Sequence, residues 1–292
     1  RVNPFHVRGD VRCQPILPRT TAAMRTRLVP ALRSAPAASS AACARRSAVA
    51  AIFRIDPSTG DELVLFIKRV ANPRDPWSGN IAMPGGGAEP ADGADDERTA
   101  MREANEEVGI DLADARWEPL GRLADDKLIY SRGRPLSVSV FGFAWRERSA
   151  PAPAPRAQPG EVDAAWWVPT ELLRPASLRW WSHPIGELSP WVRGRGFTAR
   201  ALRACLRAGG CEHVRVAAVA LPPPPASAQP ADAFMLWGLT LGFVSDVLGR
   251  AGRPRLTGPG AARAEFETPI YPARDAEGAP AGRLAAAALR SV

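Results

Sequence analysis

The chain has 292 residues, 46% of them apolar, which is enough to form one large domain or two small ones around a packed core. Its longest apolar stretches, such as residues 47–53 and 216–221, are far shorter than the roughly 20 residues that span a bilayer. Four cysteines in a chain of this length do not form the dense disulfide framework of a small secreted protein. Composition therefore excludes a transmembrane helix and favours a globular protein without a membrane partner.

The net charge of +8 is confined to the N-terminal segment. Residues 1–46 contain nine arginines and one aspartate, whereas residues 47–292 contain 29 basic and 29 acidic residues. The main part of the chain is therefore neutral, which argues against a nucleic-acid partner. A basic, Ser- and Ala-rich, acid-poor leader is typical of a transit peptide to a mitochondrion or another organelle; without one, the protein is expected in the cytoplasm. Alternatively, residues 30–33 open a short first helix of the folded domain, with Pro30 at its first position.

The first predicted elements are two β-prone runs at residues 47–54 and 63–69. The turn-forming stretch Asp56-Pro-Ser-Thr-Gly60 separates them, so we expect an antiparallel hairpin. Residues 79–83 form a short strand that leads into Pro84-Gly-Gly-Gly87. Because side chains are absent from this loop, its backbone can approach a ligand closely.

An acidic helix comes next, and the elements after it are less regular. They are strands at residues 120–123, 136–145 and 164–168, a surface linker at 150–155, a short helix at 169–173 and a final helix at 234–249. Residues 47–250 are therefore predicted to form the folded domain, with an insertion at about residues 174–233. Residues 251–292 are expected to form a low-complexity tail with little power to form a core.

The acidic helix is predicted over residues 96–108, with Asp95 or Asp96 as its N-cap and Gly109 as the left-handed residue that ends it. At 100° per residue, Glu103, Glu106 and Glu107 share an arc of about 100°, so they are expected to face the same point. Beside this arc runs an apolar stripe that would pack on the sheet, made of Ala100, Met101, Ala104 and Val108.

Two interpretations of the acidic arc are open. It is either a solvated charged face or a binding site for hard divalent cations, and energetics favour the cation site. Like charges three and four residues apart destabilise a helix by a few tenths of a kcal/mol per pair, and carboxylates near a helix C-terminus oppose its dipole. A helix whose charges served only solubility would carry lysines among its glutamates. The residue pattern therefore predicts Mg²⁺ or Mn²⁺ at Glu103, Glu106 and Glu107.

The segment from Gly86 to Ile110 resembles the Nudix box, whose pattern is Gly-x5-Glu-x7-Arg-Glu-U-x-Glu-Glu-x-Gly-U with U aliphatic. The second half fits from Arg102-Glu103 to Gly109-Ile110. In the first half Asp92 replaces the glutamate, and nine residues instead of seven separate it from Arg102. The resemblance implies an α+β Nudix fold, in which a mixed β-sheet is sandwiched between helices (α/β/α), and a metal-dependent diphosphatase.

The longer loop is similar to the branch of the family that contains coenzyme A diphosphatases, whose loops run Pro-Gly-Gly-x-x-Asp-Pro-x-Asp. Here the stretch is Pro84-Gly-Gly-Gly-Ala-Glu-Pro-Ala-Asp92. The chain carries Trp77-Ser-Gly79 where that branch carries His-x-Gly. The substrate implied is coenzyme A or an acyl-CoA, a small-molecule diphosphate. A dinucleotide or a nucleotide sugar is the alternative substrate, and a nucleotide-binding module without turnover is the alternative function.

The resemblance also implies roles for individual residues. Glu103, Glu106 and Glu107 would hold the metal, and Arg102 would orient Glu106. Glu103 or Glu106 would act as the catalytic base, with Glu161 as another candidate.

Four further residues are candidates for substrate binding. The backbone of Gly85 and Gly86 would approach metal or phosphate, and Arg69 and Arg74 would contact the anionic substrate.

Overall fold

The computed structural model describes residues 28–33, 45–72, 77–131, 134–147, 149–184, 213–225, 227–230 and 233–256. Some predicted features lie outside this part of the chain, namely Arg74, residues 1–27 and 34–44 of the predicted leader, residues 185–212 of the predicted insertion and residues 257–292 of the predicted tail. Among the described helices, none has the length and apolar character needed to cross a membrane.

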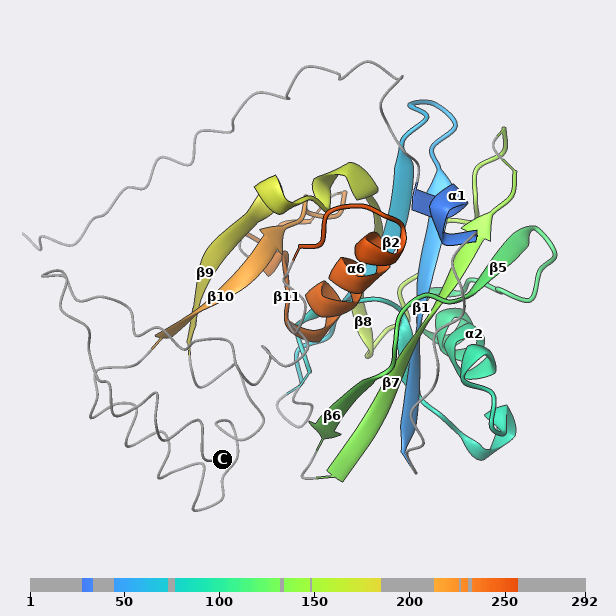
Figure 1. The fold of residues 1–292 in the computed structure, drawn as a ribbon, viewed down its shortest axis with the longest axis horizontal. Coiled ribbons are helices and arrows are strands. Elements are labelled where there is room, and N and C mark those ends of the chain that lie inside the picture. Colours follow the sequence, from blue (N-terminus) through green and yellow to red (C-terminus); the bar gives the residue numbers. More distant parts are fainter. Residues whose placement is uncertain are drawn as a thin grey trace, which may run out of the picture.

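The centre of the fold is an eight-stranded mixed sheet (Figure 1). Strands β1 (Arg46–Ile55) and β2 (Glu62–Arg69) form the predicted antiparallel hairpin, and β1 pairs in parallel with β7 (Arg134–Trp145) on its other side. The other strands are β3 (Ile81–Ala82), β4 (Gly85–Gly87), β5 (Trp117–Arg122), β6 (Lys127–Ser131) and β8 (Val162–Pro169). The sequence did not predict β6, which pairs with β7.

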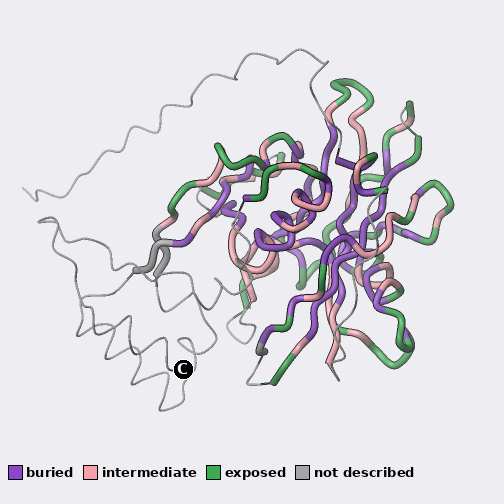
Figure 2. Tube along the Cα trace, in the orientation of Figure 1, coloured by how far each residue is buried: buried purple, intermediate pink, exposed green. Residues whose placement is uncertain are grey.

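Helices cover both faces of this sheet, which confirms the predicted α/β/α arrangement. Helix α2 (Asp96–Val108) packs on one face, where alternate β1 residues such as Ala50 and Ile52 are fully buried. Helices α1 (Leu28–Arg33) and α6 (Gly238–Arg250) pack on the other. Figure 2 shows that the central strands and the inner side of α6 are buried.

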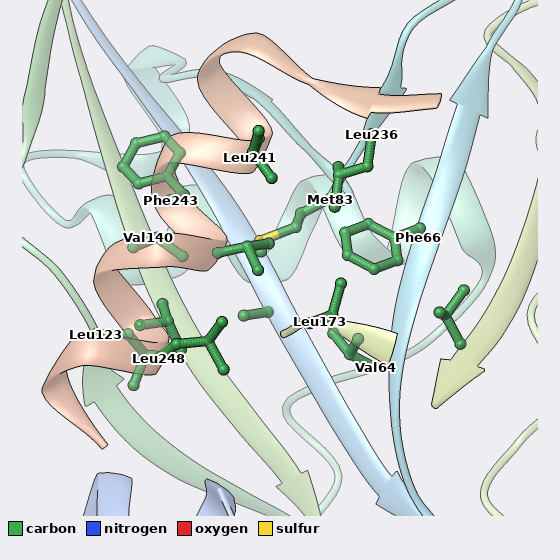
Figure 3. Packing of buried hydrophobic residues seen from close by; sticks show 14 of the residues in the cluster. Val64, Phe66, Met83, Leu123, Val140, Leu173, Leu236, Leu241, Phe243 and Leu248 are labelled. Atoms are coloured by element: carbon green, nitrogen blue, oxygen red, sulfur yellow. The ribbon is translucent and has the colours of Figure 1, made fainter. Parts of the chain in front are cut away.

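The core on the α6 side is built from every second residue of the central strands and from one side of α6. Phe66 of β2, Val140 of β7, and Phe243 and Leu248 of α6 belong to one buried cluster, in which Met83 lies between Val140 and Phe66 (Figure 3). Period-two alternation places these strand residues on this face and their neighbours on the α2 face.

A second, three-stranded sheet consists of β9 (Leu178–Pro184), β10 (His213–Ala220) and β11 (Met235–Trp237). The predicted final helix is therefore wrong at its start, because residues 235–237 pair with β10 and α6 begins at Gly238. A short apolar run does not distinguish a strand from a helix by periodicity. The predicted short helix near residue 170 is a 3₁₀ turn over Thr170–Leu172, and a second 3₁₀ turn covers Pro175–Ser177.

The helix predicted near Pro30 exists, but it begins at Leu28, so Pro30 is its third residue. The buried Glu62 carboxylate accepts the backbone N–H groups of Leu28 and Val29, both at 2.9 Å. It thereby satisfies two N–H groups that a helix end leaves without partners. The folded body thus includes residues 28–33, and on the C-terminal side it includes Leu256, which is buried in the α6 core.

Candidate active site

Helix α2 forms where its sequence predicts, from Asp96 to Val108. The Asp95 side chain accepts the N–H groups of Glu97 and Arg98, and Gly109 ends the helix at a φ of 66°. The middle of the apolar stripe, Ala100 and Ala104, is fully buried against the sheet. The capping residues fix where α2 begins and ends, and the buried stripe fixes which side of the helix faces the sheet. Together they determine which side of α2 carries its glutamates.

Glu107 is the most buried of these glutamates, with 2% of its surface exposed. One carboxylate oxygen accepts the Gly85 backbone N–H at 2.8 Å, and the other accepts from Arg69 Nη1 at 3.3 Å. Burial raises the pKa of Glu107 to about 7, and the nearby Glu103 and Glu161 carboxylates add to the increase. The structure therefore brings together the predicted residues Gly85, Arg69 and Glu107.

Glu103 lies one turn earlier and packs directly against the glycine-rich strand β4. A Cβ atom added to Gly86 would lie 2.5 Å from Glu103 Oε1. Only glycine leaves room for this carboxylate. The Gly86 backbone, which was predicted to approach metal or phosphate, therefore approaches a glutamate of the site. Burial raises the pKa of Glu103, which the neighbouring Arg102 counteracts.

Glu106 lies at the edge of the site, with 53% of its side chain exposed. Its Oε2 accepts from Arg102 Nη1 at 2.8 Å, which confirms the predicted i, i+4 pair. The expectation that all three glutamates face one point is therefore too simple. Glu103 and Glu107 turn toward β4, whereas the cation of Arg102 holds Glu106 near the solvent.

Asp92 is a site residue whose contacts the sequence did not reveal. Its carboxylate forms a two-pronged ion pair with Arg102, with Nε to Oδ1 and Nη2 to Oδ2 both at 3.0 Å. Arg102 Nη2 also donates to the carbonyl oxygen of Gly87 at 2.8 Å and lies 3.0 Å from Glu103 Oε1. The Arg102 hydrogen bonds lower the pKa of Asp92 to about 2 and raise that of Arg102. Arg102 thus ties the loop, the glycine strand and the glutamates together.

The extra residues between Asp92 and Arg102 form a defined connection. A 3₁₀ turn covers Pro90–Asp92, Gly93 follows with a φ of 66°, and Asp95 then caps α2. The turn allows an aspartate, one methylene shorter than glutamate, to reach the arginine.

Basic and aromatic residues of β2 and β8 have different surroundings. The Lys68 ammonium lies on the opposite face of β2, where it donates to the Ala233 carbonyl oxygen at 3.1 Å and sits over the Phe234 ring. Trp166 is buried in the core, whereas Trp167 lies on the α2 side with the Arg54 guanidinium over its ring.

Glu161 lies just before β8, and its carbonyl oxygen accepts the Val70 N–H. Its charge raises the pKa values of both Glu103 and Glu107, so all three carboxylates are close enough to repel one another. Among the described residues, no three acidic, histidine or cysteine side chains already surround a common point. The donor set nevertheless fits a hard divalent cation, because such a cation compensates the repulsion between carboxylate oxygens.

Comparisons with known proteins agree with this geometry. The family model of the NUDIX domain matches residues 44–191, half of the chain. An uncharacterized protein of Schizosaccharomyces pombe is 38% identical over 123 residues, which cover 41% of this chain. The chain spans about a third of that relative's length, since the match covers 36% of it.

Solved structures of low similarity also match. An Ap4A hydrolase of C. elegans is 19% identical, with 43% of this chain and 80% of the other covered and a TM-score of 0.34. The NUDIX domain of Shewanella oneidensis NrtR, complexed with ADP ribose, is 17% identical, with 43% and 73% covered and a TM-score of 0.33.

Fold and site together are those of a NUDIX domain, and Nudix enzymes generally use divalent metal ions. The chain belongs to the Nudix family.

Proposed function

We propose that the protein hydrolyses the diphosphate of coenzyme A or an acyl-CoA with the help of Mg²⁺ or Mn²⁺. The observation that carries the hydrolytic reaction is the buried carboxylate of Glu107 and the half-buried carboxylate of Glu103, both packed against β4. The choice of coenzyme A is supported by the sequence of the loop from Pro84 to Asp92 and by the connection from Asp92 to Arg102, which is two residues longer than in the usual Nudix pattern. The Asp92–Arg102 ion pair gives that longer connection a defined place in the site.

Glu103, Glu106 and Glu107 would hold the metal. When bound, the cation neutralises charge on the phosphoryl oxygens and makes a water molecule more acidic. Arg69, which contacts Glu107 at 3.3 Å, is placed to hold an anionic phosphate. A raised pKa suits Glu103 to take a proton from water, and Glu161 is the second candidate. Arg102 limits the motion of Glu106 and Glu103, which reduces the entropy lost when they bind a cation.

A panel of diphosphates tests the proposal, with coenzyme A, an acyl-CoA, a dinucleotide and a nucleotide sugar each incubated with the protein and Mg²⁺. We expect coenzyme A to yield 4′-phosphopantetheine and adenosine 3′,5′-bisphosphate. Preferred cleavage of the dinucleotide or the nucleotide sugar would reject coenzyme A as the substrate but would still support diphosphate hydrolysis. Lack of hydrolysis of every compound would reject the enzyme and leave a binding module.

Two glutamine variants locate the reaction on α2. Glu107→Gln should reduce kcat by more than about 100-fold, because even groups that only orient metal ligands contribute 10–100-fold. Glu97→Gln is the matched control, since Glu97 lies on the same helix about 15 Å away along its axis. Equal activity of the two variants would contradict the assignment of Glu107.

A further inference from the structure

A cleft of about 590 Å³ lies next to the glycine-rich strand, outside the cluster of glutamates. Its volume is within the range of sites that hold small molecules. The residues that define its chemistry are Arg45, Ser47, Trp77, Gly87, Glu89 and Leu136.

Strand β4 separates this cleft from the glutamates. Gly86 faces Glu103 on the α2 side. Gly87 is the next residue and pairs with Ser47 of β1, so side-chain alternation directs it to the opposite side, where the cleft lies. The Gly87 carbonyl oxygen accepts from Arg102, which also contacts Glu103. Arg102 therefore links the strand that lines the cleft to the glutamates on its other side.

The cleft combines an aromatic surface with polar groups. Trp77 supplies an indole on which a flat ring can stack, and Leu136 adds apolar surface. Arg45 and Arg46 both line the cleft and give it positive charge.

Glu89 at the rim offers carboxylate oxygens to hydroxyl or amino groups. A flat ring joined to a sugar and a phosphate matches this combination better than a flexible, uncharged chain.

We propose that the cleft binds the nucleoside portion of the substrate, with a purine ring against Trp77 and its phosphate toward Arg45. The inference rests on the proposed function in one respect, namely that the diphosphate lies at the glutamates. It assigns substrate selection to Trp77, the residue at which the chain departs from the coenzyme A branch in sequence.

The experiment measures binding without turnover. Adenosine 3′,5′-bisphosphate and 4′-phosphopantetheine are each titrated into the full chain by calorimetry in the presence of EDTA. We expect the nucleotide to bind, and Trp77→Ala to weaken its binding by about 10- to 100-fold, the usual contribution of stacking on an aromatic side chain. Trp77→Phe should restore part of the affinity, and 4′-phosphopantetheine should show no dependence on Trp77.

Gly87→Val provides a second variant that does not disturb the indole. A Cβ at Gly87 meets no atom within 4 Å, so the fold should tolerate valine while the cleft becomes narrower. We expect this variant to lose nucleotide binding. Trp180→Ala is the matched control, because Trp180 lies on β9 with 56% of its surface exposed.

The outcomes separate this inference from the proposed function. Equal nucleotide affinity in wild type, Trp77→Phe and Gly87→Val would overturn the inference. Failure of the wild type to bind the nucleotide would also overturn it, and so would an affinity for 4′-phosphopantetheine that depends on Trp77. Nucleotide binding that depends on Trp77 and Gly87 would support it even if coenzyme A is not hydrolysed, a result that would reject the proposed substrate alone.

Discussion

Replacement of Gly86 by alanine should inactivate the enzyme while leaving it folded. The new Cβ would lie 2.5 Å from Glu103 Oε1, whereas real Cβ contacts are essentially never shorter than 3.0 Å. The carboxylate must therefore move by at least about 0.5 Å, and by about 1 Å to reach ordinary van der Waals distance. A misplacement of about 1 Å can reduce the rate by about 100-fold. We expect kcat to fall by roughly 10- to 100-fold, or about 1.4–2.7 kcal/mol in activation free energy.

The melting temperature should change little, because the atoms that must move are the end of a flexible side chain. Gly85→Ala gives the contrasting result, since its Cβ would meet the Ala48 backbone oxygen at 2.4 Å and the Val49 Cα at 2.6 Å. Backbone cannot move aside so easily, so this variant should unfold at a lower temperature. Gly87→Ala meets open space and should melt like the wild type.

A double-mutant cycle tests the cause directly. In Glu103→Ala the carboxylate is gone, so adding Gly86→Ala should cause no further loss of kcat. Steady-state hydrolysis and thermal unfolding of the four proteins complete the cycle. If the two substitutions multiply their effects, or if folded Gly86→Ala retains the wild-type rate, the contact between Gly86 and Glu103 does not control activity.

Two predictions concern stability. The Arg102 pair lowers the pKa of Asp92 from 3.8 to about 2, so it stabilises the fold by about 2 kcal/mol above pH 4 and loses this effect as the pH falls toward 2. Asp92→Asn should therefore unfold in less urea at neutral pH, with a difference from wild type that disappears near pH 2; a constant difference would refute this origin. Glu62→Ala removes the acceptor for the first two N–H groups of α1 and should reduce the free energy of unfolding by about 3 kcal/mol. The exposed Glu147→Ala serves as its control, and equal urea midpoints for these two variants would contradict the capping role.

The acidic helix and the first hairpin were predictable because their signals are local. Asp95 and Gly109 mark the ends of α2, and the buried stripe of Ala100 and Ala104 sets its orientation. Strand β6 was missed although it forms a hairpin with β7, which follows it directly in the chain. The three-stranded sheet was missed because its strands pair with partners farther away in the chain. The same holds for residues 235–237, whose pairing with β10 overrides a helical pattern.

The sequence by itself determined that Glu103, Glu106 and Glu107 share one arc of α2, because their spacing on a helix follows from the backbone geometry alone. The sequence did not determine which groups hold these glutamates in position. The Gly85 N–H and Arg69 reach Glu107 from 22 and 38 positions away, and the cleft joins Ser47 of β1 to Trp77 and Leu136. Only the register of β4 on β1 decides that Gly86 faces Glu103 while Gly87 faces the cleft, since a shift by one residue would exchange the two sides.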